Sequence, residues 1–306
     1  MAIAENILDL VGKTPLLNLG NITKDIPAKV YGKCEYFNPL GSVKDRTALA
    51  MIEAAEKKGE INKDTLILEA TSGNTGIGLA FVGAVKGYKV ILTMPDGMSL
   101  ERRKLLKALG AELVLTPAHL GMNGAIEKLN EIAKERKNVF ITQQFNNEAN
   151  PRVHYETTAP EIDAALSGKV DILVAGVGTG GTLAGITRYF KEKNKNFHSV
   201  AVEPKDSAVL SGEEPGPHML QGIGAGFIPG NIQNGDFDEI LPVSNEDAVK
   251  MTRRLAKEEG VFVGISAGAN VHAALEIAKK PENKGKNIVT ILCDFGERYL
   301  STTLFD

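Results

Sequence analysis

Short apolar runs alternate with longer amphipathic segments through the first half of the chain. The apolar runs are rich in β-branched residues and close at glycine or proline, while the segments between them have the period of a helix. Segment 99–109 shows the helical type, because it begins on Ser99 and stops at Gly110. Repeated strand–helix–strand units predict a mostly parallel sheet with helices on both faces. The predicted strands are 66–71, 89–94, 111–116 and 139–142.

The same alternation resumes after Asn150 and Pro151. The pattern as a whole predicts the α/β fold class, with two open, mostly parallel twisted sheets flanked by helices. We assign residues 1–145 to a smaller lobe and residues 146–306 to a larger one. Segment 207–234 has neither period and is rich in Gly, Pro and Gln, so we expect a long ordered loop of the functional kind. The later predicted strands are 171–177, 198–202, 239–243 and 287–292, and the helices are 182–193, 245–259 and 266–279.

Composition narrows the range of partners. The 306 residues carry a net charge of −3, with 35 basic and 38 acidic side chains well mixed along the chain. This mixing argues against a nucleic-acid stripe or a membrane-binding face, and it favours a small-molecule ligand. The longest strongly apolar run, 77–85, is far shorter than the roughly 20 residues that span a bilayer. With no secretory leader pattern at the N-terminus, we expect a soluble cytoplasmic protein.

The metal-ligand residue types show no metal-binding pattern. Cys34 and Cys293 are the only cysteines and are far apart in sequence, which predicts two free structural thiols in a reducing compartment. The histidines have no ligand spacing either, and we interpret them as surface or packing residues. We therefore predict no metal site. The histidines are His119, His154, His198, His218 and His272.

Lys44 occupies a position that helix electrostatics disfavour. Ser42 can cap a helix that ends at Gly59, with Asp45 closing a capping box three residues later. Lys44 then lies in the first turn, where the helix dipole destabilises an ammonium and favours the neutral, nucleophilic amine. The alternative is a lysine that points into water, as most first-turn lysines do. By itself the position favours that alternative.

A polar glycine-containing turn, residues 71–76, follows the predicted strand 66–71 directly. Its sequence, Thr-Ser-Gly-Asn-Thr-Gly, leads into a helix, so free backbone N–H groups, hydroxyls and an amide gather at one end of the sheet. Such a turn can bind an anion. It can also serve only to pack a helix against a strand, although four polar side chains make the binding role somewhat more favourable.

A second glycine-rich turn, residues 176–182, has the same strand-to-helix context and predicts a phosphate site. Gly176, Gly178 and Gly181 also match the GxGxxG pattern, and Glu203 follows 22 residues beyond Gly181. That combination is typical of dinucleotide binding, so an NAD-dependent oxidoreductase is one candidate. The turn does not, however, occur in the first strand–helix unit of the chain, where dinucleotide enzymes usually carry it.

Together, two anion-binding turns and an amine-reactive lysine favour a pyridoxal phosphate enzyme that acts on an amino acid. One turn would hold the cofactor phosphate and the other the substrate carboxylate. Ser266 lies at a third strand-to-helix junction, where a capping role would explain it fully. In a pyridoxal enzyme a serine can also hydrogen-bond the pyridine nitrogen without protonating it, which suits replacement at the β carbon.

Over nearly its whole length the chain resembles the cysteine synthase (O-acetylserine sulfhydrylase) family, within the tryptophan synthase β-like, fold type II group of pyridoxal phosphate enzymes. The order of the matching motifs carries the resemblance, since GxGxxG alone would be weak. The matching stretches are 12–16, 38–46, 69–76, 95–110, 143–145, 150–151, 176–182, 203–204, 221–229 and 264–268.

The resemblance implies a role for each of these motifs. Lys44 would hold the cofactor and carry the α proton, Asn74 would bond the 3′ oxygen of the ring, and Ser266 would face the pyridine nitrogen. Gly222 would line the site opposite. The implied phosphate ligands are Gly178, Thr179, Gly180, Gly181 and Thr182, and the implied carboxylate ligands are Thr71, Ser72, Asn74, Thr75 and Gln144.

The implied reaction is β-replacement of O-acetyl-L-serine by sulfide, through an α-aminoacrylate, to give L-cysteine and acetate. Related enzymes that use O-phosphoserine, or that make cystathionine, remain alternatives on the same core. The resemblance also implies a homodimer, an active site in a cleft between the lobes, and binding of the C-terminal tail of serine acetyltransferase. It further implies that an early segment, about 13–35, packs on the larger lobe.

Overall fold

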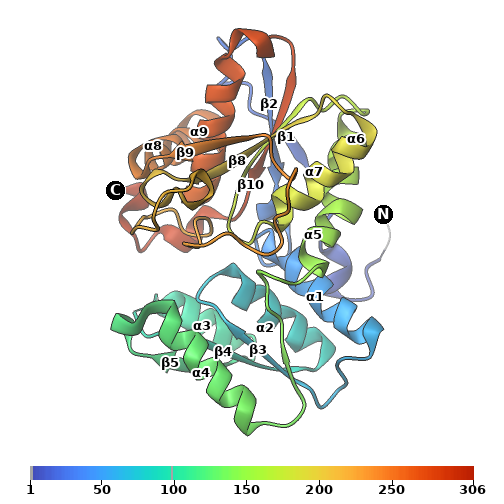
Figure 1. The fold of residues 1–306 in the computed structure, drawn as a ribbon, viewed down its shortest axis with the longest axis vertical. Coiled ribbons are helices and arrows are strands. Elements are labelled where there is room, and N and C mark those ends of the chain that lie inside the picture. The colour runs from blue at the N-terminus through green and yellow to red at the C-terminus, as the bar shows by residue number, and fades with distance from the viewer. Residues whose placement is uncertain (1–2, 98) are drawn as a thin grey trace. The chain divides into compact units, whose positions relative to one another are not determined.

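The computed structural model describes residues 3–97 and 99–306, so residue 98, inside the 95–110 motif, lies outside the described residues. The chain divides into two compact units. The first unit contains residues 1–11, 38–40 and 44–149, and the second contains residues 12–37, 41–43 and 150–306. Each unit has its own parallel-rich sheet covered by helices (Figure 1). The predicted α/β fold class is therefore confirmed.

The first unit is built on a four-stranded parallel sheet in the order β5-β4-β3-β6. Neighbouring residues of one strand enter different cores, because successive side chains of a strand point to opposite faces. Ile67 belongs to a cluster with residues of α1, α2 and α3, whereas Leu68 packs with Leu129 and Ile132 of α4. The elements are α1 (Lys44–Lys58), β3 (Leu66–Ala70), α2 (Asn74–Lys86), β4 (Lys89–Pro95), α3 (Leu100–Ala108), β5 (Glu112–Thr116), α4 (Gly121–Glu135) and β6 (Val139–Ile141).

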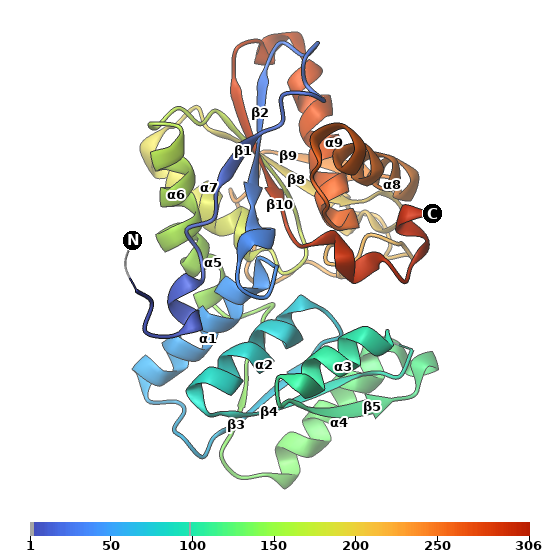
Figure 2. The same ribbon diagram turned by 180° about the vertical axis from the view of Figure 1, so that it is seen from behind.

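The second unit has a six-stranded sheet in the order β1-β2-β10-β7-β8-β9, in which only β1 runs antiparallel to its neighbour. One core lies between this sheet and helices α8 and α9, and another between the sheet and helices α6 and α7. Figure 2 shows the strands of this sheet from behind. The elements are β1 (Leu16–Asn18), β2 (Lys29–Cys34), α5 (Ala149–Val153), α6 (Ala159–Ala165), β7 (Ile172–Gly176), α7 (Gly181–Lys193), β8 (His198–Pro204), β9 (Glu239–Val243), α8 (Asn245–Arg254), α9 (Ile265–Lys279) and β10 (Asn287–Leu292).

Strands β1 and β2 come from the start of the chain but belong to the sheet of the second unit. β2 pairs in parallel with β10 over six residues, from Asn287 opposite Lys29 to Leu292 opposite Cys34. Apolar patterning did not predict either strand. The run 29–34 contains two lysines and a glycine, which weaken its strand signal, and pairing with β1 on one side and β10 on the other makes it a strand.

Most predicted elements are within one or two residues of the observed ones. The helix expected over 245–259 is divided in two, because α8 ends at Arg254 and a π-helical turn, Leu255–Glu259, leads to Gly260. The loop expected over 207–234 contains a 3₁₀ turn at Val209–Ser211 and no β-strand or α-helix. Among the described residues, no helix combines the length and apolarity that crossing a membrane requires.

Candidate active site

Lys44 is the first residue of α1, so its predicted first-turn position is confirmed. Ser42 lies two residues before the helix and forms an isolated β-bridge with Asp294. The backbone of Lys44 is held closely against α2, since a Cβ added to Gly78 would lie 2.8 Å from the Lys44 carbonyl oxygen. Asp45 is fully buried, and its carboxylate accepts a 2.6 Å hydrogen bond from the Leu40 N–H. These contacts fix the start of the helix that carries the amine.

The polar turn 71–76 joins β3 to α2, as predicted. Gly73 is the N-cap residue of α2 and no side chain caps the helix, while the Gly76 N–H donates to the Gly73 carbonyl at 3.1 Å. The positive end of the helix dipole at Asn74 favours an anion. The Gly73 N–H donates to the Thr71 hydroxyl at 3.2 Å. An arginine also reaches the turn, because Arg102 Nη1 donates to the Ser72 carbonyl at 3.2 Å.

Gln144 lies beside this turn although it is 69 residues from Thr75 in sequence. The Thr75 hydroxyl donates to Gln144 Oε1 at 2.6 Å, and Gln144 Nε2 donates to Glu69 Oε1 at 3.2 Å. The Thr142 hydroxyl donates to the other oxygen of the same carboxylate. All four side chains are at most 6 % exposed. The structure thus brings together Thr71, Ser72, Asn74, Thr75 and Gln144 within the first unit.

The second glycine-rich turn lies in the second unit, where neighbouring groups leave no space for side chains. A Cβ added to Gly178 would lie 2.1 Å from the Gly222 carbonyl oxygen, and one added to Gly181 would lie 2.0 Å from Asn150 Oδ1. Gly180 is the N-cap of α7 with a φ of +81°, and its added Cβ would lie 2.6 Å from Ile232. These positions require glycine, and the backbone of the turn stays close to its surroundings.

Buried polar side chains hold this turn in place. Asn150 Nδ2 donates to the Thr179 hydroxyl at 2.9 Å, and Asn231 Nδ2 donates to the Thr179 carbonyl at 2.8 Å. His154 lies between two hydroxyls, with Nε2 3.2 Å from Thr182 Oγ1 and Nδ1 2.9 Å from Thr158 Oγ1. His154 is completely buried, so of the two roles assigned to the histidines the surface role is wrong for this one.

Sequence reasoning placed neither Asn150, Asn231 nor His154 in the site. Asn150 precedes a proline in a motif of the resemblance, which was its only signal. Asn231 lies in the long loop 207–234, where neither sequence period gave it a position. Their roles depend on contacts between residues 28 to 52 positions apart, which periodicity along a single segment does not report.

Ser266 is the second residue of α9 and only 3 % exposed. The prediction that it occupies the cap position is wrong, because Gly264 is the N-cap and no side chain caps this helix. Helix capping therefore does not explain this serine. Its hydroxyl oxygen lies 3.8 Å from the Cβ position of Gly222, whose φ is +96°, so these two predicted residues are neighbours in the second unit.

The sequence model of the family described as "Pyridoxal-phosphate dependent enzyme" matches residues 7–294. A cysteine synthase of Staphylococcus aureus is 56% identical over 302 residues, which cover 98% of this chain and 97% of that protein. The chain belongs to the cysteine synthase family of pyridoxal phosphate enzymes. Its fold is the fold type II architecture of that group.

Solved structures agree with this assignment. The cysteine synthase of Entamoeba histolytica superposes with a TM-score of 0.97 at 47% identity, over 99% of this chain and 91% of that one. An O-acetylserine-dependent cystathionine β-synthase of Helicobacter pylori superposes with a TM-score of 0.94 at 40% identity, over the full length of both chains. The same backbone therefore carries more than one named activity.

Pyridoxal phosphate is the cofactor of this cysteine synthase family member, and the second glycine-rich turn fits its phosphate. Glycine backbone there begins a 13-residue helix, α7, whose N-terminal N–H groups and dipole favour an anion. The side chains that touch the turn are neutral amides, hydroxyls, an isoleucine and an imidazole. None of these groups carries a negative charge that would repel a phosphate.

Glu203 has a structural role that differs from that of a dinucleotide-binding acid. It is 2 % exposed, and its Oε2 accepts from the Leu210 N–H at 2.7 Å. Its Oε1 accepts from the N–H and the hydroxyl of Ser211, at 3.1 and 2.6 Å. In this family member the carboxylate holds the start of the long loop, so it does not offer its oxygens to a ribose.

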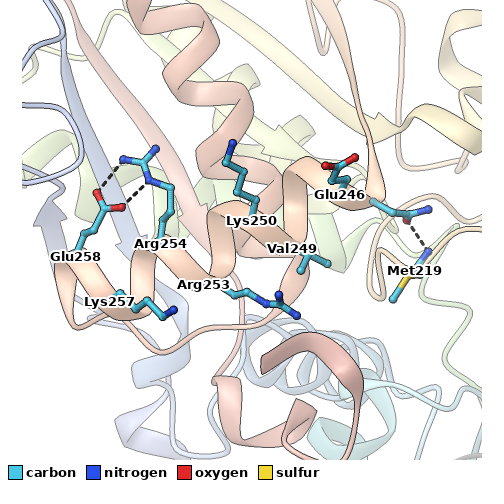
Figure 3. A pocket seen from close by; sticks show the side chains of 9 residues that line it. Met219, Glu246, Val249, Lys250, Arg253, Arg254, Lys257 and Glu258 are labelled. Atoms are coloured by element: carbon cyan, nitrogen blue, oxygen red, sulfur yellow. Dashed lines mark hydrogen bonds and ion pairs between the residues drawn. The ribbon is translucent and has the colours of Figure 1, made fainter. Parts of the chain in front are cut away.

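A separate surface pocket of about 510 Å³ lies along α8 in the second unit (Figure 3). Its lining includes Lys250, Arg253 and Lys257, while Arg254 pairs with Glu258 at 2.7 Å. Arg253 also donates to the Leu304 carbonyl at 2.7 Å. None of the residues predicted for cofactor or substrate binding lines this pocket.

Proposed function

We propose that this enzyme converts O-acetyl-L-serine and sulfide into L-cysteine and acetate, with pyridoxal phosphate as its cofactor. The observation that carries the proposal is the pair of anion-binding turns, one rich in polar side chains and one in glycine, in a chain 56% identical to a cysteine synthase of Staphylococcus aureus. A phosphate and an amino-acid carboxylate are the two anions that this reaction brings to the enzyme.

The side-chain amine of Lys44 would hold the cofactor and then take the α proton of the substrate and return it. Its place at the start of α1 favours the neutral amine, which both tasks require. When bound, pyridoxal phosphate supplies an electron sink that eases loss of the α proton and of the acetate group. Asn74 would orient the cofactor ring through its 3′ oxygen.

The second unit would hold the other end of the cofactor. Gly178, Thr179, Gly180, Gly181 and Thr182 would bind the phosphate through backbone N–H groups and hydroxyls. The Ser266 hydroxyl would bond the pyridine nitrogen without giving it a full charge, which favours replacement at the β carbon over transamination. Gly222 would line the same site.

The polar turn of the first unit would bind the substrate carboxylate. Thr71, Ser72, Asn74, Thr75 and Gln144 are gathered there, and the first N–H groups of α2 add donors. Burial of the Thr75 and Gln144 side chains keeps bulk water from competing for these donors.

The cystathionine-forming activity named for the Helicobacter pylori relative supports a second candidate, in which homocysteine replaces sulfide. Purified holoenzyme should be given O-acetylserine with sulfide or with homocysteine, and O-phosphoserine with sulfide, while amino acids are separated and quantified. We expect kcat/KM to be highest for O-acetylserine with sulfide. Cystathionine as the faster product would transfer the assignment to the second candidate, and absence of both products would overturn the proposal.

Replacement of Lys44 by alanine should abolish turnover, with a loss of about 10³-fold or more. Borohydride reduction should fix the pyridoxal group on Lys44 in the native enzyme and leave the variant unlabelled by peptide mass analysis. Lys58→Ala is the matched control, because Lys58 lies at the other end of α1 with its side chain 65% exposed. Retained turnover in Lys44→Ala would contradict the assigned role.

We also propose that the enzyme works as a cytoplasmic homodimer and that the C-terminal tail of serine acetyltransferase can occupy its active site. Both proposals are supported by the resemblance. Light scattering on the purified holoenzyme tests the dimer, and competition between O-acetylserine and a synthetic tail peptide tests the partner. A monomer, or a peptide that leaves KM unchanged, would reject the respective proposal.

A further inference from the structure

The buried carboxylate of Glu69 lies next to the polar turn, and neither the proposed reaction nor the family resemblance assigns it a role. Glu69 lies on β3, two residues before Thr71, and is 5 % exposed. We propose that Glu69 is a positioning residue that orients the Gln144 amide, whose oxygen then takes the proton of the Thr75 hydroxyl, so that the Gln144 nitrogen can bind the substrate carboxylate. This inference rests on the proposed function in one respect, the assignment of Gln144 and Thr75 to substrate binding.

Every group that faces the Glu69 carboxylate is a donor. Oε1 accepts from Gln144 Nε2 at 3.2 Å, and Oε2 accepts from the Thr142 hydroxyl. The backbone N–H groups of Gln143 and Gln144 donate to the same carboxylate. A carboxylate offers about four acceptor sites, so these four donors match its capacity.

The carboxylate also shapes the chain after β6. Gln143 has a φ of +50°, a conformation that non-glycine residues rarely adopt. Its N–H and that of the next residue both reach the Glu69 carboxylate, which holds this strained turn and directs the side chain of Gln144 toward Thr75. An isolated strained residue of this kind is typical of a functional site.

The direction of the hydrogen bonds follows from the chemistry of the groups. An amide has an acceptor side and a donor side, and an oxygen of Glu69 that faces it selects the nitrogen. Gln144 Oε1 is thereby directed to Thr75, whose hydroxyl proton it takes at 2.6 Å. The reversed amide would place its oxygen against the carboxylate oxygen, which is repulsive.

Two consequences follow for a substrate carboxylate. The Thr75 proton is committed to Gln144, so the hydroxyl oxygen of Thr75 acts as an acceptor in the site. The donors for the substrate come from the nitrogen of Gln144, which carries a second N–H, and from the backbone at the start of α2. Glu69 therefore sets which edge of Gln144 can meet an anion.

This orientation does not depend on the charge of Glu69. Burial raises the pKa of its carboxyl group above the ordinary value, and the hydrogen bonds from Thr142, Gln144 and the two backbone N–H groups only partly oppose this. A proton on Oε2 can be given to the Thr142 hydroxyl, which also accepts, while Oε1 still faces the Gln144 nitrogen. Neutral and ionised forms thus select the same amide orientation.

The test compares two variants of nearly equal side-chain length. Glu69→Met removes both acceptors and releases the Gln144 amide, whereas Glu69→Gln keeps an oxygen for Gln144 when its own nitrogen faces Thr142. We expect KM for O-acetylserine to rise about 10-fold in Glu69→Met, with kcat within about threefold, and to stay within about threefold in Glu69→Gln. Pyridoxal phosphate content and the thermal midpoint are measured on both holoenzymes.

Binding of L-serine and of L-serinamide gives a readout independent of turnover. Serinamide replaces the carboxylate by an amide, so only serine should lose affinity, by about 10-fold, when the Gln144 amide is released. General damage to the site would weaken both ligands alike and would overturn the inference. Equal serine affinity in Glu69→Met and the native holoenzyme would also overturn it.

Thr75→Val gives a second route if Glu69→Met does not fold, since it removes the other partner that fixes the Gln144 amide. Its matched control is Thr116→Val, because the buried Thr116 hydroxyl has no hydrogen-bond partner among the described residues. Serine affinity should fall in Thr75→Val and be unchanged in Thr116→Val. Equal affinities would overturn the inference even where the native enzyme makes cysteine. A native enzyme that makes no cysteine but shows the serine-specific losses would reject the proposed reaction alone.

Discussion

The two glycine-containing turns, 71–76 and 176–182, look alike in sequence but offer different groups to the anions that we propose they bind. Each follows a parallel strand and begins a helix. In the first, a Cβ added to Gly73 would have its nearest neighbour 4.0 Å away, at the Thr71 hydroxyl. In the second, a Cβ added to Gly178 would meet a backbone oxygen at 2.1 Å. We therefore expect recognition to depend on side chains in the first turn and on backbone in the second.

The support behind the two turns differs as well. A buried carboxylate, Glu69, organises the first turn through Gln144 and Thr75. Amide and imidazole side chains, those of Asn231 and His154, hold the second turn. This contrast matches the proposed ligands, because a tightly held phosphate needs a fixed backbone cradle, whereas an exchanging substrate needs side chains that tell one carboxylate from another.

Gly178→Ala should have the largest effect, because its Cβ would collide with the Gly222 carbonyl, which cannot move without displacing the long loop. We expect a loss of about 3 kcal/mol in the free energy of unfolding and no retained pyridoxal phosphate. Urea denaturation and the cofactor content of the purified protein measure both effects.

Gly73→Ala is the matched control in the other turn, where the added methyl group meets only the Thr71 hydroxyl, at 4.0 Å. We expect a change within about 1 kcal/mol, the usual cost of alanine at a helix N-cap. If Gly178→Ala and Gly73→Ala lost equal amounts of unfolding free energy, the distinction between a turn built on backbone and a turn built on side chains would be wrong.

Thr182→Val should have a smaller effect, limited to the affinity for the cofactor. It removes the hydroxyl next to His154 Nε2 and one proposed ligand of the phosphate, so the dissociation constant of pyridoxal phosphate should rise about 10-fold. Thr187→Val on the same helix is the control, since that buried hydroxyl has no hydrogen-bond partner among the residues that the structure describes. Equilibrium dialysis that finds equal cofactor affinity in both variants would exclude Thr182 from the phosphate site.

Glu69→Gln should have the smallest functional effect but should change how stability depends on pH. Burial raises the pKa of Glu69 in the folded protein above 4.5, the value for the unfolded chain. At a pH between 4.5 and the higher folded-state pKa, the folded protein binds a proton that the unfolded chain has released. The contribution of Glu69 to stability is therefore full below pH 4.5 and falls as pH rises through the native pKa.

Glutamine has no such dependence, so the stability of Glu69→Gln relative to the native protein should increase as pH rises through that window. Thermal midpoints measured for both proteins across the acid range test the sign. A difference that is constant with pH, or that decreases as pH rises, would show that the folded state does not favour the protonated carboxyl. The second turn, which has no comparable buried carboxylate among its described contacts, should show no such slope in Thr182→Val.

Periodicity located the main helices and most of the strands because each satisfies its hydrophobic pattern within a few residues. β7 is a continuous apolar run and β3 is apolar apart from Glu69; turn residues follow both strands, and both were predicted to within one residue at each end. β2 was missed because its residues Lys29–Cys34 become a strand through pairing with β1 and with β10, the latter more than 250 positions later. The cap assigned to Ser266 was wrong because the N-cap is Gly264, two residues earlier.

By itself the sequence determined the α/β class, the two turns, the first-turn position of Lys44 and the family to which the chain belongs. These features depend on short segments, because hydrophobic periodicity, glycines and capping residues act locally. Only the tertiary structure decided which glycines lie against a neighbouring backbone, that Glu203 holds a loop, and that Glu69, Gln144 and Thr75 form one chain of hydrogen bonds. Those contacts join residues far apart in sequence, and the direction of each hydrogen bond depends on which groups burial brings face to face.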